Sequence, residues 1–116
     1  MSIKRLTATI LAGWFAFSAA AFAADPVTLV IHNKHFEPEH LQLPAGVKLK
    51  LVVRNQDAIP AEFESYDLSR EVVVPGHAEV AIYIGPLDPG SYGFFNDFNH
   101  DMQGTITAAP AAGKGD

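Results

Sequence analysis

The chain has 116 residues and no cysteine, and its 8 basic and 13 acidic residues give a formal net charge of -5 at pH 7. A chain of this length supports one domain, and without cysteine it has neither disulfides nor thiolate chemistry. The acidic balance argues against a nucleic acid partner and suits cations.

The first 23 residues are typical of a secretory signal peptide. Lys4 and Arg5 precede an apolar run over residues 6–22, and the small residues Ala21 and Ala23 fit a cleavage site after position 23. An uncleaved membrane anchor is the alternative, although the run is short for a membrane span. We therefore expect export to the periplasm.

The remainder shows the pattern of short β-strands. Apolar and polar residues alternate over short runs, and Pro-Gly punctuation separates the runs. Strands are expected at 27–33, 41–43, 47–55, 61–65, 71–74, 78–84, 91–96 and 104–108. The spacing predicts an all-β antiparallel sandwich of about 7–8 strands over residues 24–108, followed by a disordered tail at 109–116. A metal or catalytic site is expected at one end, where loops meet.

Two carboxylates share one strand of this pattern. Phe63 is expected to point inward, so that alternation places Glu62 and Glu64 together on the opposite face. Carboxylates side by side repel each other unless a cation neutralises them. The alternative is that both residues simply face water.

The segment after Tyr92-Gly-Phe-Phe is a candidate chelating loop. Asp97 and His100 are three residues apart, a spacing that allows both to bind one ion in a tight turn. Met102 adds a soft ligand that would favour copper. The same composition is also ordinary for a turn, because Asn and Asp bond their own backbone.

The other histidines and the serines carry weaker signals. His35 precedes a turn after the first strand, whereas His32, His40 and His77 are expected to be solvated. A hydrolase triad would need a Ser in a nucleophile elbow with an oxyanion-forming Gly pattern, and neither Ser65 nor Ser69 has one.

Long segments of the chain resemble cupredoxins. The segments "HFEPEHLQLPAGVKLKLVVRNQDAIPAEFES" and "VVVPGHAEVAIYIGPLDPGSYGFF" carry an F-x-P corner, P-A-G before a strand ending in Asn, and P-G-x-Y before the last loop. This resemblance implies a Greek-key sandwich. Blue-copper members use a His and a Cys where this chain has Ala61 and Asn96, so the resemblance implies no blue-copper site here.

A Cys-free subgroup is the better match. "PAEFES" and "GPLDPGSYGFFNDF" resemble the cupredoxin-like components of bacterial iron-uptake systems, which accompany an inner-membrane iron permease and a periplasmic metal-binding partner. The resemblance implies a copper or iron ion and help in oxidising Fe(II). Relatives commonly carry a His at the position of Asn99, one residue before His100. The metal-facing positions so implied are Glu62, Glu64, Asp97, His100 and His35.

Two other functions remain open at this stage. One is a non-catalytic periplasmic carrier or chaperone that binds copper or iron without changing its oxidation state. The other is a metal-free interaction module that keeps the sandwich without the site. Activity on Fe(II) separates an oxidase from a carrier, and bound metal separates both from the module.

Overall fold

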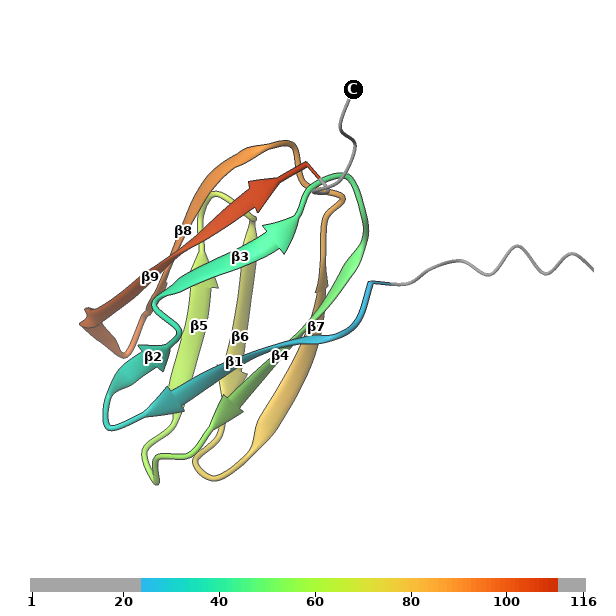
Figure 1. Ribbon diagram of the computed structural model, residues 1–116. Coiled ribbons are helices and arrows are strands. Elements are labelled where there is room, and N and C mark those ends of the chain that lie inside the picture. Colours follow the sequence, from blue (N-terminus) through green and yellow to red (C-terminus); the bar gives the residue numbers. More distant parts are fainter. Residues whose placement is uncertain (1–23, 111–116) are drawn as a thin grey trace, which may run out of the picture.

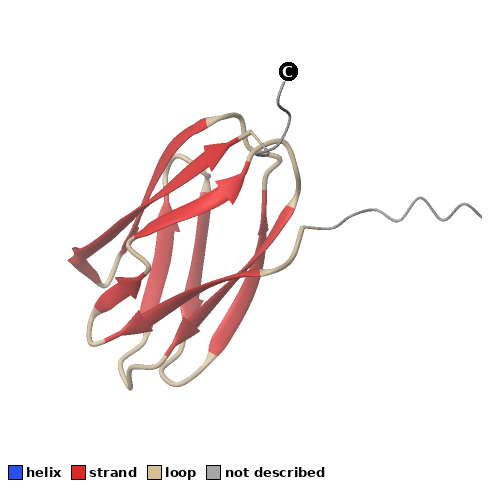
Figure 2. Ribbon diagram, viewed as in Figure 1, coloured by secondary structure: helices blue, strands red, loops and turns tan. Residues whose placement is uncertain are grey.

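The computed structural model describes residues 24–110, which form two packed β-sheets (Figures 1 and 2). The predicted signal peptide and residues 111–116 of the predicted tail lie outside the described residues. Among residues 24–110, no helix is long and apolar enough to span a membrane. The strands are β1 (Val27–His32), β2 (His35–Glu37), β3 (His40–Pro44), β4 (Leu49–Asn55), β5 (Ala61–Ser65), β6 (Arg70–Val74), β7 (Glu79–Ile84), β8 (Gly90–Asn96) and β9 (Asn99–Ala109).

The two sheets have mixed strand directions. One sheet has the order β2-β1-β4-β7 and the other the order β3-β9-β8-β5-β6. Most neighbours are antiparallel, but β1 pairs with β4 and β3 pairs with β9 in parallel. The predicted sandwich is confirmed, while the purely antiparallel arrangement is corrected at these two pairs.

The core lies between the sheets and follows the alternation of each strand. In β5 the residues Ala61, Phe63 and Ser65 are buried, whereas the two glutamates between them are half-buried on the outer face. Phe63 and Phe36 each pack against Phe94, with ring centroids 5.3 and 4.9 Å apart respectively. This aromatic contact joins the two sheets near the β8–β9 turn.

Two predicted element boundaries are wrong in a way that matters for the site. β2 was expected to be a loop, and β9 begins at Asn99 rather than at 104. Only Asp97 and Phe98 separate β8 from β9. Most of the expected chelating loop is therefore strand. Its pairing with β8 is irregular, because the register jumps from Phe95 opposite Gln103 to Asn96 opposite Asn99.

Candidate functional site: an acidic cluster on the outer face

Strand β5 presents two carboxylates on the outer face of the five-stranded sheet. Phe63 is fully buried, and Glu62 and Glu64 therefore point to the other side, as alternation predicts. Glu64 lies opposite Glu71 on β6 and opposite Phe95 on β8. Both β5 glutamates are half-buried in this surface rather than fully solvated.

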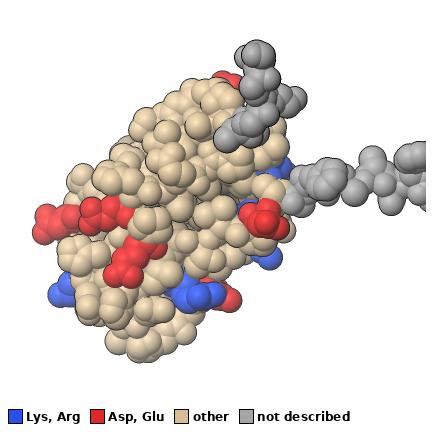
Figure 3. All heavy atoms as spheres, in the orientation of Figure 1, with Lys and Arg blue, Asp and Glu red and all other residues tan. Residues whose placement is uncertain are grey.

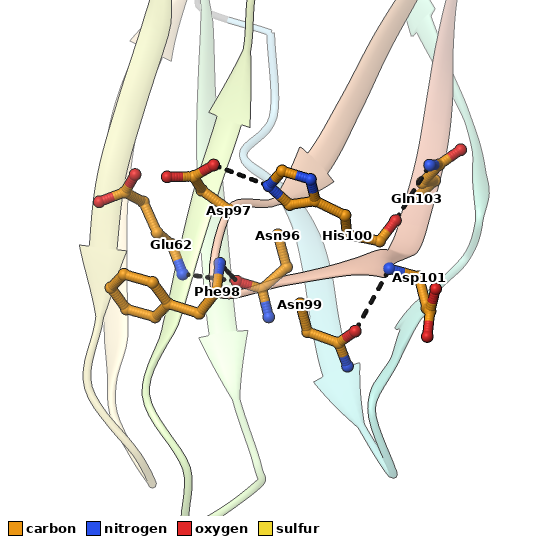
Figure 4. Close-up of polar contacts among 8 residues, drawn as sticks. All are labelled: Glu62, Asn96, Asp97, Phe98, Asn99, His100, Asp101 and Gln103. Atoms are coloured by element: carbon orange, nitrogen blue, oxygen red, sulfur yellow. Dashed lines mark hydrogen bonds and ion pairs between the residues drawn. The ribbon is translucent and has the colours of Figure 1, made fainter.

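The third carboxylate comes from the turn between β8 and β9. The backbone N–H of Asp97 donates to the carbonyl oxygen of Glu62 at 2.9 Å, which fixes the turn against β5. One carboxylate oxygen each from Glu62, Glu64 and Asp97 lies within 4.8 Å of the other two. We call these three residues the acidic cluster. Figure 4 shows the side chains of Glu62 and Asp97 pointing the same way from neighbouring backbone segments.

The carboxylates of the acidic cluster repel one another. The pKa of Glu62 is raised by partial burial, by the neighbouring Asp97 carboxylate and by the charge of Glu71, with a smaller effect of Glu64. Each of these causes disfavours the charged form of the carboxyl group. A bound cation would reverse the effect, because it replaces repulsion between carboxylates by attraction to a shared charge.

His100 extends the cluster through Asp97. Its Nε2 atom lies 2.9 Å from Asp97 Oδ1, and its ring packs edge-on against Phe95 at 5.2 Å between centroids. The imidazole is 66% exposed. In its present position the imidazole can orient the Asp97 carboxylate, and after a small rotation it can bind an ion directly.

Asn96 anchors this geometry from inside the sandwich. Its buried side chain accepts hydrogen bonds at Oδ1 from the backbone N–H of Glu62 at 2.9 Å and of Phe98 at 3.0 Å. Its Nδ2 donates to Met102 Sδ at 3.3 Å. From the sequence, Asn96 was identified only as the residue in place of a cysteine, although alternation with Phe94 already predicts that it points inward.

Met102 lies on the inner side of the sheet and does not join the acidic cluster. It is buried and lines a pocket of about 240 Å³ together with Ala61, Asn96 and Asn99. Asn99 lines the same pocket, whereas His100 lies on the outer face against Phe95. His100 and Met102 are two residues apart and would share a face in a regular strand, so the register shift in the β8–β9 pair is what separates them. The expected grouping of Met102 with Asp97 and His100 is corrected for this reason.

His35 also lies apart from the acidic cluster. It belongs to β2 in the other sheet, where its Nδ1 atom faces the Glu39 carboxylate at 3.8 Å. The site is also displaced from the expected end of the sandwich, since the cluster lies on the outer face of a sheet beside that end. Figure 3 shows further acidic side chains around the end that carries β2 and the β8–β9 turn.

The comparisons with known proteins agree with this architecture. A family model described as "Cupredoxin-like domain" matches residues 5–108. The chain belongs to the cupredoxin-like family. It is 40% identical over 81 residues to "Uncharacterized protein RP394" of Rickettsia prowazekii (strain Madrid E), a match that covers 69% of this chain and 65% of that protein.

Solved structures share the cupredoxin-like fold at low identity. Amicyanin from Paracoccus versutus aligns with a TM-score of 0.58 and 18% identity, over 78% of this chain and 88% of amicyanin. The metal-binding domain of the Cu(I)-exporting P-type ATPase CopA of Streptococcus pneumoniae D39 aligns with a TM-score of 0.62 and 16% identity, over 72% and 84% of the chains. Identities this low support the fold alone.

The pocket of this cupredoxin-like chain does not fit a blue-copper centre. Ala61, Asn96 and Asn99 provide neither thiolate nor imidazole, and the two polar atoms of the Asn96 amide already serve protein groups. Met102 is a weak ligand by itself. The donor set that suits a hard or borderline ion is the acidic cluster with His100, on the other side of the same sheet.

Proposed function

We propose that this cupredoxin-like chain is a periplasmic metal-binding protein that holds copper or iron at the acidic cluster and takes part in ferrous iron uptake. The observation that carries the proposal is the convergence of three carboxylates, from β5 and the β8–β9 turn, within 4.8 Å of one another. Such oxygens are the donors that a hard cation requires. His100 adds one imidazole at the rim of the same cluster.

The chemistry favours Fe(II) as a substrate that is oxidised. Carboxylate oxygens stabilise Fe(III) more than Fe(II), so binding by Glu62, Glu64 and Asp97 lowers the potential at which iron gives up one electron. Cu(II) or another one-electron acceptor takes that electron. The protein contributes the carboxylate positions, which Asn96 and the Asp97 backbone hold in place.

Support for copper and for partners comes from the family. The similar domain of CopA is described with Cu(I), and the motifs around Glu62 and Asp97 resemble those of iron-uptake components. We therefore propose a periplasmic metal-binding partner and an inner-membrane iron permease as the proteins served by this chain. The -5 charge of the chain is consistent with a cation rather than a nucleic acid as ligand.

The second candidate is a carrier that hands over its ion unchanged. The observation in its favour is accessibility, because the Asp97 side chain is 40% exposed and the cluster lies on an open sheet face. An exposed site exchanges its ion with a docked partner without a large conformational change. The same residues serve both candidates, so activity on Fe(II) has to separate them.

The experiment measures loss of Fe(II) in air for the copper-loaded protein against free copper at equal concentration. For the oxidase, the wild type exceeds the free-copper control, while the double variant Asp97→Ala/His100→Ala falls to the control rate and keeps its β-type circular dichroism. The matched variant Asp88→Ala/His40→Ala, which removes the same side-chain types elsewhere, keeps the wild-type rate. If the wild type binds metal at the cluster but matches free copper, the protein is a carrier.

A further inference from the structure

A pair of histidines faces outward from the other sheet, away from the acidic cluster. His32 ends β1 and His35 begins β2, and the two residues are direct cross-strand partners in the hairpin. Their neighbours Ile31 and Phe36 are buried, so alternation places both imidazoles on the outer face. Cross-strand partners have Cβ atoms about 4.5–5.5 Å apart, so rotation of the exposed His35 side chain can bring its imidazole toward that of His32.

A carboxylate stands beside this pair. Glu39 Oε1 lies 3.8 Å from His35 Nδ1, and both side chains are more than half exposed. Two imidazoles and one carboxylate form a donor set that Cu(II) and Zn(II) prefer, whereas a hard ion prefers oxygen alone. The three side chains differ from the acidic cluster in chemistry as well as in place.

The imidazole of His32 is poorly satisfied by protein groups. Its Nε2 accepts a hydrogen bond of 3.2 Å from the exposed Asn33 amide. Its Nδ1 is buried and has no hydrogen-bond partner within residues 24–110. An ion that binds this ring at Nε2 displaces only the one long contact to Asn33.

The hairpin that carries the pair is held rigidly. Asn33 and Lys34 have positive φ angles of 50° and 60°, as a two-residue hairpin turn requires. The Asp57 carboxylate, from the loop after β4, accepts hydrogen bonds from both turn N–H groups at 2.8 and 2.9 Å. The backbone positions of the two histidines are therefore fixed before any ion binds, which lowers the cost of forming a site.

We propose that His32, His35 and Glu39 form a second metal site, which takes an imidazole-preferring divalent ion, Cu(II) ahead of Zn(II). The site is independent of the acidic cluster and of the oxidase or carrier function proposed for it. An ion bound there would link β2, a three-residue edge strand, to β1.

The test is a Cu(II) titration followed by electron paramagnetic resonance, in which coordinated imidazole gives nitrogen superhyperfine splitting. We expect two coupled nitrogens in Glu62→Gln/Glu64→Gln/Asp97→Asn/His100→Ala, which keeps the pair but lacks the acidic cluster and its imidazole. Adding His32→Ala/His35→Ala to that variant should abolish the signal and weaken Cu(II) binding at least 10-fold. His40→Ala/His77→Asn, which alters two histidines elsewhere, should retain the signal.

A second measurement on the unaltered protein covers the case in which the alanine variant does not fold. Zn(II) is added to the wild type and the ¹⁵N resonances of all imidazoles are followed by NMR. The proposal predicts that His32 and His35 shift together with one saturation curve, while His40 and His77 do not shift with it. It is overturned if the pair does not respond, or if the two-nitrogen splitting survives when His32→Ala/His35→Ala is added to the folded variant that lacks the acidic cluster and His100.

Discussion

The pocket and the acidic cluster lie on opposite faces of the same sheet, and they differ in what they can bind. The pocket contains Asn96, Asn99 and Met102, and the cluster contains Glu62, Glu64 and Asp97. Both draw residues from β5 and the β8–β9 hairpin, and the pocket adds Ile31 and the loop after β4. Alternation separates their residues on β5, and the irregular register of β8 and β9 separates His100 from Met102. In this chain the inner face of the sheet carries side chains that pack and form hydrogen bonds, and the carboxylates lie on the outer face.

Asn96 connects the two regions. It belongs to the pocket, yet its side-chain oxygen accepts from the backbone of Glu62 and so positions the cluster. Where blue-copper members have a thiolate ligand, this chain has an amide that serves the backbone. The amide thereby supports the acidic cluster on the opposite face of the sheet.

The largest expected effect separates the two regions by metal affinity. Glu64→Gln/Asp97→Asn removes two of three cluster charges and should weaken Cu(II) or Fe(II) binding by about 100-fold or more at this site. Met102→Leu replaces a pocket side chain by one of similar volume and should change the affinity for Cu(II) or Fe(II) by no more than about twofold. Isothermal titration calorimetry measures the affinity of both variants. A larger loss in Met102→Leu than in Glu64→Gln/Asp97→Asn would place the site in the pocket.

The next effect concerns the support that the pocket gives to the cluster. Asn96→Ala leaves the N–H groups of Glu62 and Phe98 without their acceptor, at about 1–3 kcal/mol each, and should lower the free energy of unfolding accordingly. Urea denaturation measures it. The control Asn99→Ala loses one longer, exposed bond to the Asp101 N–H and should cost much less. Equal losses would contradict the anchoring role.

A smaller effect is expected at the rim of the cluster. His100→Ala removes the contact to Asp97 Oδ1 and should weaken metal binding by about 10-fold, as for groups that orient a ligand. His40→Ala, which removes an exposed imidazole bonded to Thr105 on the same sheet, should have no effect. A loss as large as that of Glu64→Gln/Asp97→Asn would make His100 a principal ligand instead.

The smallest effect follows from the raised pKa of Glu62. Because the fold disfavours its charged form, this group costs stability at pH values above its unfolded-state pKa, and the cost disappears as the pH falls through the raised pKa of the folded state. Metal-free Glu62→Gln should therefore melt slightly higher than the wild type at pH 7 and equally at pH values below both pKa values. Differential scanning calorimetry across this range checks the sign, and a lower melting temperature at pH 7 would contradict it.

Much of the fold and part of the site could be predicted from the sequence. Pro-Gly punctuation and alternation located most strands, and Phe63 as the inward residue put Glu62 and Glu64 on one face. The segment Asn99-His-Asp-Met102 belongs to a strand rather than to the predicted loop, although Asn and Asp favour turns. The opposite directions of His100 and Met102 follow from a register shift in the β8–β9 pair, which neither alternation nor local composition predicts.

Anomalous diffraction from crystals soaked in Cu(II) or iron salts shows on which face of the sheet the ion binds. We expect a peak on the outer face, about 2.0–2.6 Å from carboxylate oxygens of Glu62, Glu64 and Asp97. A peak beside Met102 Sδ and Asn96, with none at the carboxylates, would contradict it.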